Sequence, residues 1–441
     1  MTSLSQIIDE VLGRDFTIEC SNIVCRGRND SVPPYFAGPG VISGGVSGPF
    51  TVSLHDSLEK DSKQFIELVN RVHHGLMMCF DATDYDGCQW TGGWLNPTIH
   101  GIHISRSFVT GMFPQLTADI PLTSFDTFRN STANYYFGDL GLPMLEVANI
   151  QRSRGKEVER RSTYWDRTVL EFEGSTVQIS KDEEKNRTVV SSAHTEDWGP
   201  PYCEVGLADA IGFTCATKKR PRITIRYFED RAILFVRETP SDVEPRIPRP
   251  IFYQGPRDRN FWNLFLAFLA DCKAKKEFDG TPLARLFSEL AYASMGTIHV
   301  LVLSLVVAVD DLVAQITGQS PPVPDLQELK EYIDQWPGNA ELKKSAIAVV
   351  SSMLSRTSTR RHLKELSANG VVSPAQIKVW DELRPKLAHG KVADYDEKLL
   401  ASRNQLIGMV YQLAARLLGY KGVLADYTGP IPTELNFQWS S

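Results

Sequence analysis

A run of five prolines divides the chain into two halves with different hydrophobic patterns. Seventeen residues contain Pro240, Pro245, Pro248, Pro250 and Pro256. Proline fixes φ and has no backbone N–H, so neither a helix nor a central strand persists through such a run. The chain has 441 residues, which is more than one ordinary hydrophobic core requires. We therefore predict a domain over 1–240, a linker over 241–256 and a second domain over 257–441.

The N-terminal half shows the period of two that is typical of strands buried on one face. Phe50–His55 alternates apolar and polar residues, and Val169–Ser180 resumes the pattern. Arg222–Arg237 contains two further alternating runs around a turn at Glu229-Asp230. One good helix is predicted here, from Ser57 to Met78. The half is therefore expected to be β-rich, as one domain or as two subdomains.

The C-terminal half has helical spacing and helix-start signals. Phe261, Phe265 and Phe268 recur at three and four residues, and Thr281-Pro282 is a good N-cap followed by proline at the first helical position. The helix that starts there is expected to run to Thr317. We predict an α+β multidomain protein in which the β-rich domain is followed by an all-α helical bundle, with an extended tail.

Composition favours a cytoplasmic protein. The seven cysteines are scattered and form no CxxC, which suits a reducing compartment. The N-terminus has no basic segment followed by an apolar run, so no signal peptide is expected. Ile298–Val309, the most apolar segment, would span about 18 Å as a helix, less than the roughly 30 Å hydrocarbon core. It is predicted to be a buried helix, with no membrane partner.

Several classes of site are disfavoured by the sequence. A net charge of −6 argues against a constitutive, non-specific nucleic-acid binder. Neither GxGxxG nor GxxxxGK[ST] occurs. Asp84-Tyr85-Asp86-Gly87 partly matches a calcium loop, but the carboxylates required at its first and twelfth positions are replaced by Ala82 and Gly93. No cofactor and no metal site are predicted.

The segment Leu383–Gly390 carries the chemistry that we single out. It contains Arg384, four residues, and then His389 beside a glycine helix stop. A guanidinium is always charged and binds phosphate oxygens bidentately, and an imidazole moves protons near neutral pH. Together they are a minimal set for cleaving RNA through a 2′,3′-cyclic phosphate.

Helix geometry constrains how the two residues could cooperate. Positions i and i+5 are rotated by about 140° beyond one full turn, so they do not share a face. Either the helix is broken between them or residues from two chains combine. Pro385 favours a break, because it lacks the N–H for residue 381 and disfavours helical geometry at Arg384.

The Arg-x4-His segment in a late helical region resembles the signature of the HEPN superfamily, which includes many metal-independent ribonucleases. The order of a β-rich half and a HEPN half is similar to that of ApeA-type anti-phage defence proteins. The resemblance implies a homodimer in which two motifs face one cleft, with Arg384 and His389 as catalytic residues. The residue after the arginine is commonly polar in active members; here it is Pro385.

Other residues are candidates for supporting roles. Asp310 and Asp311 interrupt an apolar helix, so either could orient His389 or pair with Arg384; a solvent-facing position is the alternative. Lys386 and Lys391 flank the motif as candidate phosphate contacts. From Ser373 to Gly422 eight Lys/Arg oppose five Asp/Glu, a local charge of +3 that favours a polyanionic ligand.

We therefore expect a metal-independent endoribonuclease that acts in abortive infection, with RNA as substrate and a phage-derived trigger at the N-terminal domain. The alternative is a non-catalytic HEPN-like module that dimerises and binds a protein or nucleotide partner. In a purely structural interpretation of the motif, Arg384 pairs with a carboxylate such as Asp381 and His389 caps a helix end.

Overall fold

The computed structural model divides the chain into two compact units. It describes residues 4–13, 15–27, 33–45, 49–58, 60–100, 108–122, 129–147, 152–154, 157–159, 165–182, 184–238, 245, 247–251, 259–318, 324–388, 397–429 and 432–440. The sheet unit comprises Met1–Ala208 and Lys219–Val243, and the helical unit comprises Asp209–Lys218 and Glu244–Ser441. The helical unit therefore includes Asp209–Lys218, a short segment from the first half of the chain.

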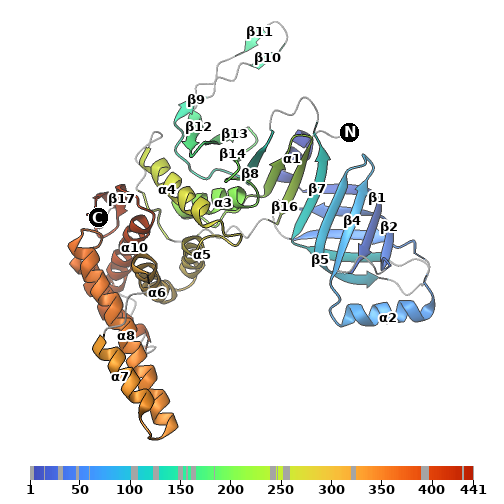
Figure 1. The fold of residues 1–441 in the computed structure, drawn as a ribbon. Helices are drawn as coiled ribbons and strands as arrows, with labels where there is room; N and C mark the ends of the chain where they lie inside the picture. The colour runs from blue at the N-terminus through green and yellow to red at the C-terminus, as the bar shows by residue number, and fades with distance from the viewer. Residues whose placement is uncertain are drawn as a thin grey trace. The chain divides into compact units, whose positions relative to one another are not determined.

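The sheet unit is built on one antiparallel sheet (Figure 1). Among the described residues it has fourteen strands, in the order β4-β1-β2-β3-β6-β5-β7-β16-β15-β8-β14-β13-β12-β9. The bounds are β1 Phe16–Arg26, β2 Phe36–Gly44, β3 Phe50–His55, β4 Met78–Asp84, β5 Gln89–His100, β6 Phe108–Phe113, β7 Gln115–Pro121, β8 Ser131–Phe137, β9 Glu146–Val147, β12 Trp165–Phe172, β13 Ser175–Asp182, β14 Arg187–Ala193, β15 Ile223–Tyr227 and β16 Arg231–Arg237. The short strands β10 (Arg152–Arg154) and β11 (Glu157–Glu159) pair separately. The predicted β-rich half is confirmed.

The long strand β5 lets the sheet both close on itself and continue. Its first residues, from Gln89, pair with β4 and β7, whereas Asn96–His100 pair with β6. The pairing of β4 with β5 closes a ring of β4, β1, β2, β3, β6 and β5. Phe113 contacts two rings inside the core: its centroid lies 5.5 Å from that of Phe50 and 4.9 Å from that of Phe80. A Cβ at Gly92 would lie 2.4 Å from Phe80, so this crossing of β5 over the core requires glycine.

Three helices accompany the sheet among the residues that the structure describes, and the sequence predicted one of them. The predicted helix is α2 (Ser62–His73), which Asp61 and Gln64 start with a capping box. The others are α1 (Leu4–Gly13) and α3 (Tyr202–Thr214). Helix α3 is apolar on nearly every side and buried at Cys203, Leu207 and Ile211. The sequence did not predict this helix, because a helix that is buried on all sides has no amphipathic pattern.

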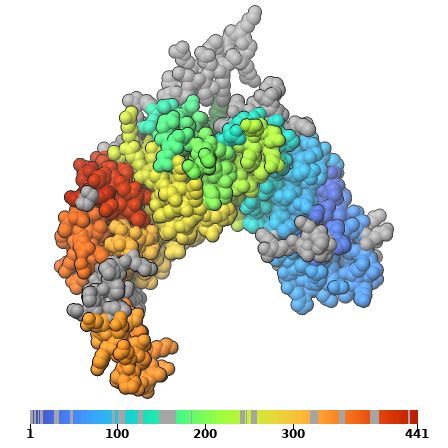
Figure 2. Space-filling model, viewed as in Figure 1, coloured from blue at the N-terminus to red at the C-terminus, as the bar shows by residue number. Residues whose placement is uncertain are grey.

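The helical unit contains α4 Arg259–Lys275, α5 Pro282–Met295, α6 Ile298–Thr317, α7 Pro324–Gln335, α8 Ala340–Ala368, α9 Pro374–Ala388 and α10 Glu397–Leu417. Figure 2 shows the α7–α8 hairpin, in orange, projecting from the rest of this unit. The predicted all-α bundle is wrong in one respect. The tail forms a hairpin of β17 (Gly422–Asp426) and β18 (Thr433–Phe437), so the extended segment pairs with itself.

The predicted single helix from Thr281 to Thr317 is also wrong, because it ends at Met295 and α6 begins at Ile298. Thr297 caps α6, and its hydroxyl accepts a hydrogen bond from the backbone of Val300 at 3.4 Å. Gly296 ends α5. The Gly-Thr pair is a stop followed by a start, a local signal that the uninterrupted apolar run obscured.

Helix α6 is the central helix of its unit and packs against α5, α8, α9 and α10. Among the described helices it has the length and apolar composition of a membrane span, a test that core helices of soluble proteins also pass. One side of it is buried in the unit, including Leu301, Leu305 and Leu312. Val300, Leu303 and Val307 are exposed, so the predicted buried helix is buried on one face only. Residues 247–251 of the expected linker are bound to α10, because Tyr411 of that helix donates a hydrogen bond to the carbonyl of Pro248 at 2.6 Å.

Candidate functional site

Arg384 lies on the face of α9 that packs against the other helices of its unit. The side chains of Ile377, Trp380 and Leu383 recur at three-residue steps and are buried. Ser373 starts the helix, accepting a hydrogen bond on its hydroxyl from the backbone N–H of Gln376 at 3.2 Å. Since Arg384 follows Trp380 by four residues, it lies one turn further along the same face. The phase of α9 therefore directs Arg384 towards α6.

The guanidinium of Arg384 is held at the junction of α9 and α6. Its Nε donates to Asp310 Oδ2 at 2.9 Å, and the two side chains are 24% and 27% exposed. Its Cζ lies 5.3 Å from the centroid of the Trp380 ring, in cation–π range. The Trp380 indole in turn donates to the carbonyl of Val306, one turn before Asp310, at 3.4 Å. Two consecutive turns of α9 are thus in register with two of α6.

The ion pair occupies only one nitrogen of Arg384. Among the described residues, Nε alone donates a hydrogen bond, so neither terminal amino group is engaged by them. The side chain is partly exposed, so these two groups can be reached from solvent. Two parallel N–H donors on a fixed guanidinium match two oxygens of one phosphate. The arrangement is able to bind an anionic oxygen pair.

Asp310 has a second oxygen whose partner the described residues do not supply. Its Oδ1 is buried and accepts no hydrogen bond from them. A buried carboxylate oxygen normally has a donor, because desolvating it without one is costly. Oδ1 is therefore a vacant acceptor position beside Arg384.

Pro385 does not break α9, contrary to the expectation from sequence. The helix runs through Pro385 to Ala388. Proline there removes the hydrogen bond to the carbonyl of Asp381 and crowds it, which costs about 3 kcal/mol in a helix interior. The buried Trp380 and Leu383 and the Arg384–Asp310 pair hold the segment helical nonetheless. Arg384 thus has helical geometry, and the predicted break between it and His389 does not occur at Pro385.

The remaining predicted site residues fall into three groups. Asp311 faces solvent and accepts a hydrogen bond from Gln315 at 3.0 Å, so Asp310, not Asp311, pairs with Arg384. Lys386 is exposed on α9. His389 and Lys391 lie outside the described residues. The structural interpretation expected Arg384 to pair with a carboxylate, and it does, but the carboxylate is that of Asp310. The example named there is wrong, because Asp381 pairs with Arg360 at 3.0 Å.

The chain matches no family model, no curated protein and no solved structure.

Trp380 is the site residue that sequence reading missed. It is fully buried, and it both positions Arg384 and anchors α9 to α6. Its signal was its place four residues before the motif arginine, which on a helix predicts contact. Within the part of the chain that the structure describes, no group of three His, Cys, Asp or Glu side chains could hold a metal ion.

Proposed function

We propose that the chain is a metal-independent endoribonuclease of HEPN type, with Arg384 and His389 as its catalytic residues. The observation that carries the proposal is the anchoring of Arg384. Asp310 and Trp380 orient the guanidinium, and no described residue forms a hydrogen bond with its two terminal amino groups. A purely structural arginine buried for packing would be expected to use these groups as well.

The proposed reaction is an internal transesterification of RNA. The 2′-hydroxyl attacks the adjacent phosphorus as His389 accepts its proton, and the bond to the 5′-oxygen breaks to leave a 2′,3′-cyclic phosphate and a 5′-hydroxyl. Arg384 neutralises the charge that develops on the non-bridging oxygens of the phosphorane. The negative charge of Asp310 keeps the guanidinium oriented while it does so.

A homodimer formed on α6 would bring two such sites together. Val300, Leu303 and Val307 are 48%, 43% and 56% exposed, at helical spacing along one face of α6. Asp310 follows Val307 by three residues, so the Arg384–Asp310 pair flanks this apolar stripe. A two-fold partner seated on the stripe would place Arg384 of one chain close to the motif of the other, which removes the need for Arg384 and His389 to share a helix face.

The wider setting follows from the resemblance to ApeA-type defence proteins. The protein would act in the cytoplasm of an infected bacterium, where the sheet unit would detect a phage-derived trigger. RNA cleavage by the helical unit would then arrest the cell.

The test is cleavage of total RNA by the purified full-length chain, with the ends of the products analysed for cyclic phosphate. Arg384→Lys keeps the charge but loses the pair of parallel N–H donors, so we expect the cleavage rate to fall by about 100-fold. The matched control is Arg361→Lys, which alters an exposed arginine of α8 paired with Glu365 and should leave the rate unchanged. Cleavage should also survive excess EDTA.

The alternative is a HEPN-like module that binds a partner and cuts nothing. It would be supported by intact RNA with wild-type protein at every concentration tested. Cleavage that EDTA stops and Mg²⁺ restores would instead replace the proposed chemistry with a metal-dependent one.

A further inference from the structure

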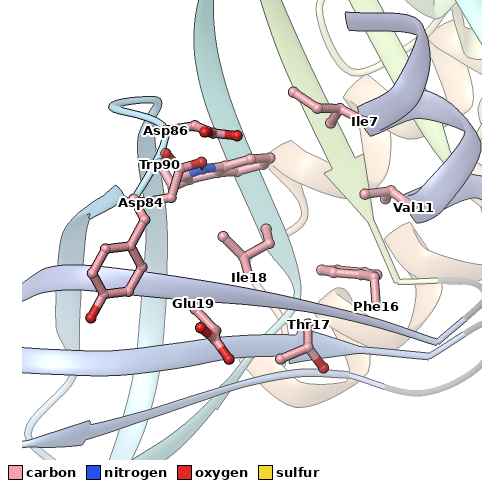
Figure 3. A pocket seen from close by; sticks show the side chains of 10 residues that line it. Ile7, Val11, Phe16, Thr17, Ile18, Glu19, Asp84, Asp86 and Trp90 are labelled. Atoms are coloured by element: carbon pink, nitrogen blue, oxygen red, sulfur yellow. The ribbon is translucent and has the colours of Figure 1, made fainter. Parts of the chain in front are cut away.

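A cavity of about 260 Å³ lies in the sheet unit, lined by α1, β1, β5 and the turn between β4 and β5 (Figure 3). Both oxygens of Asp84 in its lining already accept hydrogen bonds, from the Trp90 indole at 2.9 Å and from the backbone of Cys88 at 2.8 Å. This carboxylate is therefore used to hold the β4–β5 turn. The helical unit contains the opposite situation, because two cations beside Trp439 have N–H groups that no described residue accepts.

Trp439 is fixed to the segments that follow two helices of the helical unit. Its indole N–H donates a hydrogen bond to the carbonyl of Tyr420, just after α10, at 3.1 Å. The backbone N–H of the next residue, Ser440, donates to the carbonyl of Asn369, the residue that ends α8, at 3.1 Å. The ring is therefore held in place from both sides along the chain.

Two positive charges lie over this ring. Arg416 Cζ is 3.7 Å and Lys421 Nζ is 4.3 Å from the ring centroid of Trp439, so the two charged groups are within about 8 Å of each other. Arg416 belongs to the last turn of α10, and Lys421 is exposed. Contact with the indole favours each cation, but two like charges at this separation repel each other.

No described carboxylate compensates these two charges. Neither Arg416 nor Lys421 forms an ion pair or a side-chain hydrogen bond with a described residue. Between Glu397 and Asp426 the sequence has four Lys/Arg and no Asp or Glu, so no neighbour in the chain supplies an acid. Other cations of the chain that lie over an aromatic ring also have a carboxylate partner: Lys60 with Asp56, Arg226 with Glu204, and Arg384 with Asp310.

The helix macrodipole accounts for only part of this arrangement. A cation in the last turn of a helix is stabilised by the negative end of the dipole, which suits Arg416. That end carries roughly half an elementary charge, however, so it does not neutralise two full charges. The carbonyl of Tyr420, which follows the helix, already accepts the indole N–H of Trp439. An anion is thus the missing partner of the two cations.

We propose that Arg416 and Lys421 bind a phosphate group beside Trp439. A phosphate group has the opposite charge and several oxygens, so it can approach both cations and accept hydrogen bonds from their unused donors. The phosphate comes either from the backbone of RNA or from a free phosphate compound. The first source rests on the proposed function and makes the site a second contact for the substrate, away from the Arg384–Asp310 pair. The second source does not depend on RNA cleavage.

The test uses the full-length chain with His389→Ala, so that RNA is not cut, at low ionic strength. Calorimetry follows the binding of inorganic phosphate, and anisotropy follows the binding of a short fluorescein-labelled single-stranded RNA over a range of salt concentrations. We expect Lys421→Gln to weaken phosphate binding by about threefold or more. If RNA supplies the phosphate, the slope of log K against log salt should become shallower by about 0.7 for each cation removed, by Lys421→Gln and then by Arg416→Gln.

The matched control is Lys344→Gln, which removes an exposed lysine of α8 that forms no ion pair with a described residue and should leave both measurements unchanged. Lys421 is exposed, so its variant should fold, and unchanged thermal melting will verify this.

The outcomes separate the two sources of phosphate. A shallower salt slope, with or without weaker phosphate binding, would identify the RNA backbone as the ligand. Weaker phosphate binding with an unchanged slope would identify a free phosphate compound. No effect of Lys421→Gln in either titration, or an equal effect of Lys344→Gln, would overturn the proposal. Phosphate binding by a chain that cleaves no RNA with His389 intact would contradict the proposed function and leave this site supported.

Discussion

At the scale of single residues, Arg384 owes its place to side chains from two helices. Trp380 precedes it by one turn on α9, and Asp310 reaches it from α6. The other oxygen of that carboxylate, Oδ1, accepts no hydrogen bond from a described residue. The residues that orient Arg384 are therefore not the residue proposed to transfer protons, so their effects on stability and on cleavage can be measured separately.

His389→Ala should abolish RNA cleavage and cellular toxicity. The free energy of unfolding should change by no more than about 1 kcal/mol, because a residue proposed to act in catalysis contributes to chemistry more than to packing. Toxicity in cells and urea denaturation of the purified variant measure the two effects. Toxicity equal to that of wild type would show that His389 is not catalytic.

Asp310→Ala should lower the free energy of unfolding by about 1–2 kcal/mol, because it leaves a partly buried guanidinium without its partner. The neighbouring Asp311→Ala is the matched control and should change it by less than about 0.5 kcal/mol. In a double-mutant cycle, Arg384→Ala should have a much smaller effect once Asp310 is absent. Additive effects in urea denaturation would mean that the observed ion pair contributes no coupling.

At the scale of elements, α9 tolerates a proline because its buried face outweighs one lost hydrogen bond. Pro385 stands three residues before the described end of the helix. Arg384 keeps helical geometry there, so the conformation of this turn is decided by contacts with α6 and not by the proline.

Pro385→Ala should therefore stabilise the protein by about 1 kcal/mol, because it restores an N–H donor to the carbonyl of Asp381. The larger conformational freedom of the unfolded chain offsets part of the gain. Single-turnover cleavage should stay within about twofold of wild type, since Arg384 is already helical. A large loss of cleavage with intact stability would show that the proline itself shapes the site.

At the scale of the whole molecule, we propose that a second copy of the chain binds to the exposed apolar stripe of α6. Val300, Leu303 and Val307 lie on the helix that also positions Arg384. Burying them together removes apolar area from water and places two candidate sites near one interface.

Val307→Asp should convert a dimer to a monomer and reduce RNA cleavage, because it would bury a charge at the interface. Light scattering at micromolar concentration measures the mass. The control is Leu342→Asp, at an equally exposed apolar position on α8 outside this stripe, which should leave both properties unchanged. A wild-type monomer with full activity would exclude a site shared between two chains.

The sequence by itself determined the features that depend on neighbouring residues. The alternation in Phe50–His55 predicted β3, and Thr281-Pro282 marked a helix start, because strand phase and capping are local. Only the tertiary structure decided that Asp310, 74 residues away, pairs with Arg384, and that β5 closes a ring with β4. It also overrode the local signal at Pro385. These outcomes depend on contacts between distant segments, whose energies no local pattern records.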